Sequence, residues 1–263
     1  MLQQAVDFHA ESDALHALIE PLKPADWGRK TLFKDWTIND VIVHLHFFNV
    51  AADLSLTDED AFADLLGRLM TAIQGGEGHL AFSHEYLNHA NGYALRDQWR
   101  AFYPEMAERF GAADPEARVK WAGPDMSVRM SITARQMETW AHGQAVFDML
   151  GATRTEADRL KNIAVIGVKT YGWTFANRKM EPPGPPPYVR LTAPSGAVWE
   201  WNEPSAENVV EGDAAAFCQV VTQTRNIADT SLRVVGEPAT GWMAIAQCFA
   251  GQPQDPPPPG TRG

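Results

Sequence analysis

A glutamate and a histidine stand four residues apart within residues 130–150, a segment whose apolar periodicity predicts a helix. At this spacing Glu138 and His142 lie on one helical face, about one turn apart, so both side chains can reach a single ion. The rest of this face is small and largely apolar. A carboxylate in such surroundings is costly to desolvate unless a proton, a cation or a metal compensates its charge. The pair is therefore a candidate for part of a metal site.

A second histidine lies on the apolar face of an earlier predicted helix. His44 shares a stripe with Val41 and Phe48, so it points into the protein. If the two helices are neighbours, two imidazoles and one carboxylate converge, a set that suits zinc or another divalent first-row metal. Three protein ligands leave a fourth position for water or substrate, which favours a catalytic or ligand-binding metal. The alternative is a metal-free network of buried hydrogen bonds.

Helices are the elements that must position these residues. Thr37 followed three residues later by Asp40 is a near-capping box, which predicts that the helix carrying His44 begins there. About five or six helical segments precede residue 181, with short loops and no strand signal among them, so we expect an up-and-down bundle. The other predicted helices cover residues 8–22, 58–74, 95–110 and 156–179.

The later part of the chain has a different pattern. Pro or Gly fills every position from Pro182 to Pro187, so we expect a helical domain over residues 1–181 and a second domain over residues 182–250. YVRLTA and AVWEW flank a Pro-Ser-Gly turn and predict a hairpin. A helix after Gly212, a strand at LRVV and a last helix over residues 241–251 complete a small α+β unit. Residues 251–263 have nothing to bury, and we expect them to be disordered.

Composition excludes several classes of function. The 263 residues include 22 basic and 33 acidic side chains, and the net charge of −11 disfavours binding to nucleic acid or to anionic membranes. No apolar run approaches the roughly 20 residues that cross a bilayer, and the first residues lack signal-peptide features, so we expect a cytoplasmic protein. Cys218 and Cys248 have apolar neighbours, which predicts reduced, buried thiols and no thiolate metal site.

Three separated motifs resemble a known family. WTINDVIVHL at residues 36–45, WAGPDMS at 121–127 and METWAHGQ at 137–144 resemble the metal-binding domain of the mycothiol-dependent maleylpyruvate isomerase family, which belongs to the DinB-like group of helical bundles. The resemblance continues almost to the end of the chain. It implies a mainly α fold, with a DinB-like up-and-down four-helix bundle core, extra helices and a small α+β domain.

The resemblance also implies a site. Such bundles hold a divalent metal, usually zinc, and the ligands fall here on His44, Glu138 and His142. Nickel, iron or manganese would suit the same ligands. In the isomerase the metal is thought to activate a low-molecular-weight thiol, which adds to a cis double bond, permits rotation and leaves; coordination favours the thiolate. Ala145 stands where related sequences often have Asp, which weakens the prediction of substrate chemistry more than that of metal binding.

These observations predict a divalent-metal-binding protein that acts as a thiol-dependent isomerase or transferase on a small carboxylated or electrophilic substrate, through a metal-bound thiolate. A metal-hydroxide hydrolase is one alternative, because the same open position lowers the pKa of bound water. A non-catalytic metal- or ligand-binding protein is another. The apolar segment IAVIGVKTYGWTF could supply a homodimer interface or a contact between domains.

The remaining histidines are predicted to stay outside the metal site. His46 falls on the outer side of its helix and is expected to be exposed, together with three polar residues: Asn39, Asn49 and Asp53. Three more follow the Gly75-Gly76 break, where a mobile lid over the mouth of the bundle or plain surface is expected, and a second metal is the alternative. They are His79, His84 and His89.

Overall fold

The computed structural model describes residues 1–262 and divides into two compact units, Met1–Gly151 and Ala152–Gly263. The predicted boundary after residue 181 differs from this division. The last helix of the first unit ends at Gly151, which has a positive φ of 64° and so stops the helix. Residues 152–181 contribute instead to the core of the second unit, where a Cβ on Gly167 would come within 2.8 Å of a Val221 methyl.

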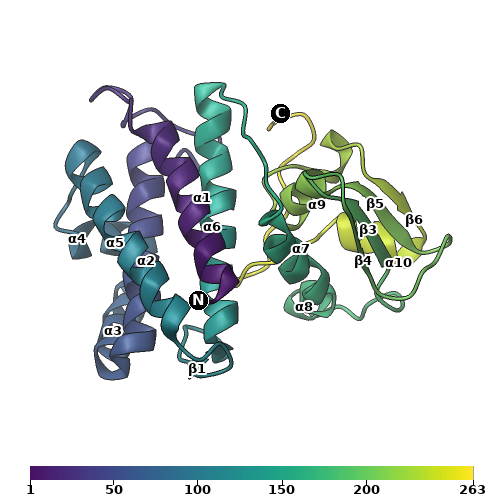
Figure 1. Cartoon of the computed structure of the whole chain (residues 1–263), viewed down its shortest axis with the longest axis horizontal. Helices are drawn as coiled ribbons and strands as arrows, with labels where there is room; N and C mark the ends of the chain where they lie inside the picture. The colour runs from purple at the N-terminus through teal and green to yellow at the C-terminus, as the bar shows by residue number, and fades with distance from the viewer. Residues whose placement is uncertain (263) are drawn as a thin grey trace. The chain divides into compact units, whose positions relative to one another are not determined.

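The first unit is a helical bundle. Four long helices pack pairwise as its core: α1 with α6 and α5, and α2 with α5 and α6 (Figure 1). Two further helices, α3 and α4, pack on α2 and on each other. The bounds are α1 (Gln3–Ile19), α2 (Ile38–Thr57), α3 (Glu59–Gln74), α4 (His79–Tyr86), α5 (Gly92–Ala112) and α6 (Val128–Leu150). The predicted four-helix core with extra helices is confirmed.

One local prediction for this unit was wrong. Two short antiparallel strands, β1 (Arg118–Val119) and β2 (Met126–Ser127), lie between α5 and α6, where the sequence indicates no strand. Strands of two residues are too short to show the alternation by which a strand is recognised. They bring the chain to Ser127, whose side chain accepts a hydrogen bond from the Met130 backbone N–H and begins α6.

The predicted capping box of α2 is present. The Thr37 hydroxyl accepts a hydrogen bond from the Asp40 backbone N–H, at 3.1 Å between N and Oγ1. The Asp40 carboxylate accepts one from the Thr37 backbone N–H, at 2.9 Å. This reciprocal pair fixes the first turn of α2 and therefore the rotation at which the helix presents His44.

The second unit is a small α+β structure. Its sheet has the order β4-β3-β5-β6, in which β3 pairs antiparallel with β4 and parallel with β5, and β5 pairs antiparallel with β6. The predicted hairpin is the β3–β4 pair. The elements are α7 (Leu160–Lys169), α8 (Tyr171–Asn177), β3 (Tyr188–Thr192), β4 (Val198–Trp201), β5 (Val209–Asp213), α9 (Ala214–Val221), η1 (Ile227–Asp229), β6 (Arg233–Val235) and α10 (Glu237–Met243).

Helix boundaries in this unit differ from the sequence predictions. The single helix expected over residues 156–179 is divided at Thr170 into α7 and α8. The last helix, expected over residues 241–251, covers Glu237–Met243 instead. Pro238 lies in its first turn, where no N–H donor is needed. Gly236 precedes it with a φ of 91° and lies so close to the Glu207 carbonyl that a Cβ would clash.

The C-terminal segment also differs from expectation, because its described part, residues 251–262, lies against the second unit. Asn177 donates a side-chain hydrogen bond to the Gly251 carbonyl at 3.1 Å, and Asn226 donates one to the Pro257 carbonyl at 2.8 Å. Proline has no backbone N–H but keeps its carbonyl, so side-chain amides can hold such a segment, and Pro257 is also buried.

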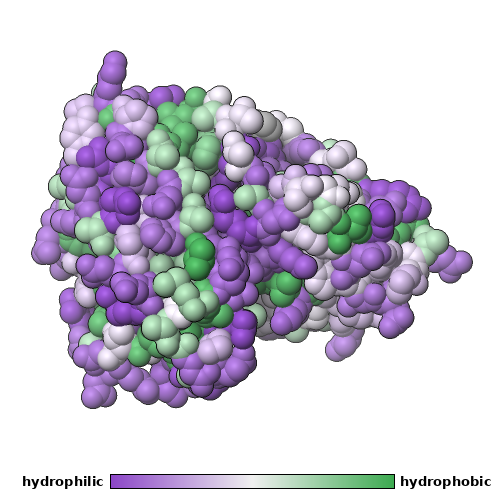
Figure 2. Space-filling model, in the orientation of Figure 1, coloured by the Kyte–Doolittle hydropathy of each residue, from purple (hydrophilic) through white to green (hydrophobic). Residues whose placement is uncertain are grey.

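The surface is mostly polar on the face drawn in Figure 2. Hydrophilic residues predominate there and hydrophobic ones are scattered among them. Most of the apolar segment considered as a dimer interface is buried inside the second unit, Ile163 and Phe175 among it, although Trp173 is exposed. Among the described residues, no helix combines the length and apolar character of a membrane span.

Candidate metal centre

Three side chains from α2 and α6 converge inside the bundle. His44 comes from α2, and Glu138 and His142 come from consecutive turns of α6. Glu138 Oε2 is 3.4 Å from His44 Nε2 and 3.1 Å from His142 Nε2. The two imidazole ring centroids are 4.4 Å apart. The structure therefore brings together the three residues that helical spacing and family resemblance select.

The separations fit a metal ion. Bonds of about 2.1 Å from a tetrahedral ion to nitrogen and oxygen place any two ligand atoms about 3.4 Å apart. The two hydrogen-bonded pairs have 3.4 and 3.1 Å, and all three ligand atoms lie within 4.8 Å of one another. A divalent ion can thus be accommodated with small side-chain adjustments. Imidazole nitrogen with one carboxylate oxygen is a ligand set of zinc and its first-row neighbours.

The protonation states also suit a metal. Burial, followed by the nearby His142, lowers the pKa of His44 to about 3, so its ring is neutral at pH 7. Burial acts to raise the pKa of Glu138, but hydrogen bonds from His142 and His44 outweigh it and hold the pKa well below its usual range. An ionised carboxylate beside a neutral imidazole is the form in which these groups bind a cation.

Aromatic rings enclose the three residues. Trp36 stacks on His142 with centroids 5.6 Å apart, and Phe33 meets the same ring edge-on at 5.0 Å. Phe48 packs against His44 at 4.8 Å. Phe33 and Trp36 lie in the loop before α2, which is closed by a 2.7 Å hydrogen bond from the Thr31 N–H to the Trp36 carbonyl. These rings restrain the imidazoles and limit water around them.

A buried cation lies one helical turn before Glu138. Arg135 is 3% exposed, and its Nε donates to Asn49 Oδ1 at 3.1 Å. Burial lowers the pKa of Arg135 to about 10, with Glu138 opposing that effect, so the guanidinium stays charged at pH 7. Sequence reasoning missed this residue, because an arginine on a helix is normally assigned to the surface.

The prediction that the other face of α2 is exposed was wrong for three residues. His46, Asn49 and Asp53 are 5%, 0% and 8% exposed. Since α2 packs against α5 and α6 as well as α3 and α4, it has no fully solvated side. Its polar residues find partners instead: Asp53 accepts from Arg109 at 2.8 Å, and His46 packs on Phe102 with centroids 5.4 Å apart.

Two of the three histidines assigned to a lid or plain surface are part of α4. His79 begins this helix, and its ring centroid lies 5.7 Å from that of His44. His84 bonds through Nε2 to Asp40 Oδ1 at 2.7 Å. His89 follows the helix and is exposed. None of these histidines belongs to the group of three ligand atoms, but His79 borders the centre. The one signal in the sequence was the Gly75-Gly76 break, after which a lid is expected.

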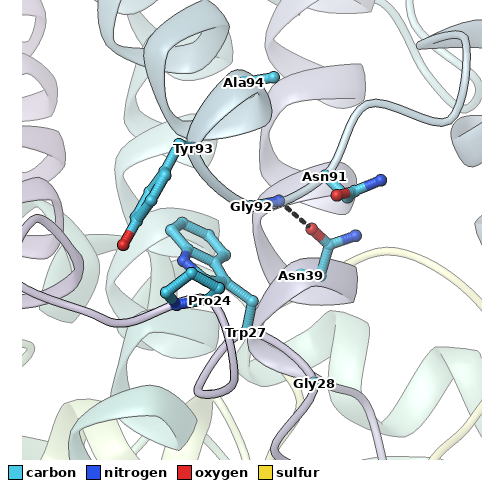
Figure 3. Close-up of a pocket in the computed structure, with 8 residues that line it drawn as sticks. All are labelled: Pro24, Trp27, Gly28, Asn39, Asn91, Gly92, Tyr93 and Ala94. Atoms are coloured by element: carbon cyan, nitrogen blue, oxygen red, sulfur yellow. Dashed lines mark hydrogen bonds between the residues drawn. The ribbon is translucent and has the colours of Figure 1, made fainter.

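A separate pocket of about 510 Å³ opens near the starts of α2 and α5 (Figure 3). Pro24, Trp27 and Tyr93 form its apolar wall. Asn39 lies at its edge and accepts a hydrogen bond from the Gly92 N–H at 2.9 Å. None of the three clustered residues lines this pocket, and none of its lining residues is a carboxylate or a histidine. The chemistry-bearing group is therefore the cluster between α2 and α6.

Comparisons with known proteins agree with the bundle. The family model described as mycothiol maleylpyruvate isomerase N-terminal domain matches residues 8–147. Two relatives from Mycobacterium tuberculosis, strains CDC 1551 / Oshkosh and H37Rv, are each 37% identical over 247 residues, which cover 94% of this chain and 95% of theirs. Both relatives bear the name uncharacterized protein.

Two solved structures share the fold. They are crystal structures of the mycothiol-dependent maleylpyruvate isomerase and of a mutant of it, with TM-scores of 0.54 and 0.53, and each covers 83% of this chain and 87% of its own. The sequence identity is 15% in both cases, so these structures support the fold and not a function. The match of the family model over more than half of the chain shows that the protein belongs to the mycothiol maleylpyruvate isomerase N-terminal domain family.

Proposed function

We propose that this protein binds one divalent metal ion, most simply zinc, through His44, Glu138 and His142, and catalyses a thiol-dependent isomerisation or transfer. The substrate is a small carboxylated or electrophilic molecule. The observation that carries the proposal is the convergence of two imidazoles and a carboxylate at metal-ligand separations, in a chain of this family. Zinc is favoured because two imidazoles and one carboxylate are an established zinc ligand set with an open position.

The bound ion would supply Lewis acidity that favours the thiolate form of a small thiol. The chain's own residues prepare that chemistry. Glu138 is held ionised and balances part of the ion's charge, while His44 is neutral and needs no deprotonation above about pH 4. Trp36 and Phe48 exclude water, which strengthens every electrostatic interaction inside the site.

The thiol must come from outside the chain. Cys218 and Cys248 are both buried and neither forms a disulfide. Burial, followed by the neighbouring Cys248, raises the pKa of the Cys218 thiol well above its usual value, so this group is a poor nucleophile at pH 7. A low-molecular-weight thiol is therefore the second cofactor of the proposed reaction. Mycothiol is the first candidate, because the structural neighbours are named as mycothiol-dependent.

The proposed substrate class follows from the structural neighbours and from the net charge of the chain. The neighbours act on maleylpyruvate, a small carboxylated molecule, which makes cis-unsaturated acids the first compounds to test. The net charge of −11 disfavours nucleic acid and anionic membranes as partners, in keeping with a cytoplasmic small-molecule enzyme.

Turnover with and without thiol tests this proposal. Zinc-loaded protein should isomerise maleylpyruvate in the presence of mycothiol, and Glu138→Gln should abolish this activity. The matched control is His89→Asn, which changes an exposed histidine outside the cluster and should keep full activity. Turnover of ester or amide substrates without any thiol would indicate a metal-hydroxide hydrolase. Metal binding without turnover of any thiol acceptor would indicate a non-catalytic protein.

A further inference from the structure

We infer that the His79 side chain contacts the small thiol that the ion of the proposed metal centre would hold. This inference rests on the proposed function and adds a fourth side chain to the site. Neither helical spacing nor the family motifs select His79, because it lies on α4, outside the two helices that carry the metal ligands.

His79 faces the centre through three rings. Its centroid lies 5.7 Å from His44, 5.8 Å from Trp36 and 6.3 Å from Phe48. Trp36 also stacks on His142, so the same indole contacts both His79 and a proposed metal ligand. The His79 side chain is half-buried against these rings. It therefore lies beside the metal ligands and is partly shielded from solvent.

His79 lies outside the group of side chains that could coordinate one ion together. Its nitrogens do not join the group of ligand atoms that lie within 4.8 Å of one another. A sulfur bound to zinc stands about 2.3 Å beyond the ion. A side chain in the second layer is therefore placed to contact what the ion holds. Imidazole suits that role because it can donate or accept a hydrogen bond.

Several contacts fix α4 on the bundle. His84 bonds to Asp40 at 2.7 Å, and Asp40 is itself part of the capping box of α2. Phe82, in the first turn of α4, packs on Phe47 of α2 with centroids 5.8 Å apart. Gly78 turns the chain into the helix with a φ of 80°. The first turn of α4 is thus anchored to the helix that carries His44.

The charge at the centre favours an anionic ligand. Glu138 is the carboxylate among the three proposed ligands, so a divalent ion there would keep a net positive charge. The charge of Arg135 also acts on His44. A thiolate is a ligand that such a positive charge favours.

Ligand binding by cobalt-loaded protein tests the inference. Co²⁺ reports its own occupancy through visible absorption bands, and a thiolate on cobalt adds a near-ultraviolet charge-transfer band. The probe is 2-mercaptoethanol, titrated into the parent, His79→Phe, His79→Gln and the control His89→Asn. The Phe variant keeps an aromatic ring in the cluster and removes the ring nitrogens, but its six-membered ring is larger than imidazole. The Gln variant, which keeps polar atoms, separates the lost hydrogen bond from the added bulk.

We expect unchanged cobalt stoichiometry in all four proteins. The dissociation constant of the thiol should rise about tenfold or more in His79→Phe, the loss expected for one hydrogen bond to a charged group. His79→Gln should recover part of this loss, and His89→Asn should behave as the parent does.

Two results would overturn the inference while the parent protein still binds the metal. One is thiol binding by His79→Phe within twofold of the parent. The other is loss of cobalt from both His79 variants, which would make His79 a metal ligand. Failure of the parent itself to bind cobalt would count against the proposed function and remove the basis for this role of His79.

Discussion

His44 and His46 are two residues apart on α2, yet they occupy very different surroundings. Both are buried, and burial lowers the pKa of each, to about 3 for His44 and about 4 for His46. His44 faces Glu138 and His142, whereas His46 faces the ring of Phe102. Burial alone therefore makes a neutral histidine. A carboxylate and a second imidazole are what turn one of the two into a candidate ligand.

The largest expected effect is on the carboxylate of the candidate site. Glu138→Gln removes the only negative charge among the three ligands, so metal affinity should fall by at least about a hundredfold, more than the loss typical of residues that merely support a ligand. Competition with a chelating dye measures this. Asp53→Asn removes a carboxylate from the other face of α2 and is the matched control. Equal metal affinity in parent and Glu138→Gln would contradict the site.

Metal should also stabilise the folded protein. At a free concentration about 100 times the dissociation constant, binding contributes about 2.7 kcal/mol, which corresponds to about 5–10 °C in the melting temperature of a unit of this size. Differential scanning calorimetry with zinc and with a chelator measures the shift. His44→Ala should lose it and His46→Phe should keep it. A shift that survives in His44→Ala would place the metal elsewhere.

The pH dependence of stability distinguishes burial from binding. Because the pKa of His46 is about 4 in the folded protein and about 6.5 when unfolded, the unfolded chain binds more protons between these values. Metal-free protein should therefore lose stability as pH falls from 6.5 to 4, on the order of 3 kcal/mol from His46. Urea unfolding across this range should show a smaller loss for His46→Phe. An unchanged slope would mean that His46 is hydrated in solution.

The smallest expected effect concerns the ion pair between Asp53 and Arg109, on the His46 face of α2. Asp53 accepts a 2.8 Å hydrogen bond from Arg109, and the Asp53 side chain is 12% exposed while that of Arg109 is 36% exposed. Asp53→Asn should cost about 1 kcal/mol of unfolding free energy, since the pair is only partly shielded from water. Denaturant titration at pH 7 checks this value. A change in metal affinity of the same variant would show that the two faces of α2 are coupled.

The His44 and His46 faces of α2 show which features of the fold could be predicted from the sequence. The capping box at Thr37 and the apolar stripe around His44 are local patterns, and both predicted α2 correctly. The stripe could not reveal that the opposite face is covered as well, because an amphipathic pattern assumes one solvated side. Asn49 and Asp53 were misassigned for that reason. Their partners, Arg135 and Arg109, are distant in sequence.

The candidate site was predictable to the extent that its spacing is helical. Glu138 and His142 are one turn apart, and family motifs linked them to His44. His79 could not be placed in the same way, because its position depends on how α4 docks, through His84 on Asp40. The domain boundary shows a similar limit. A proline-rich run is conspicuous in the sequence, but the packing of Gly167 against Val221 assigns the preceding helix to the second unit.

The most direct test of the account is the metal content of three proteins purified in parallel: the parent, His44→Ala and His46→Ala. The two variants remove buried histidines two positions apart on one helix, so a general loss of packing affects both. Elemental analysis of the folded fractions, after reconstitution with zinc, should find about one equivalent in the parent and in His46→Ala, and none in His44→Ala. No metal in the parent, or equal loss in both variants, would contradict a metal centre at His44, Glu138 and His142.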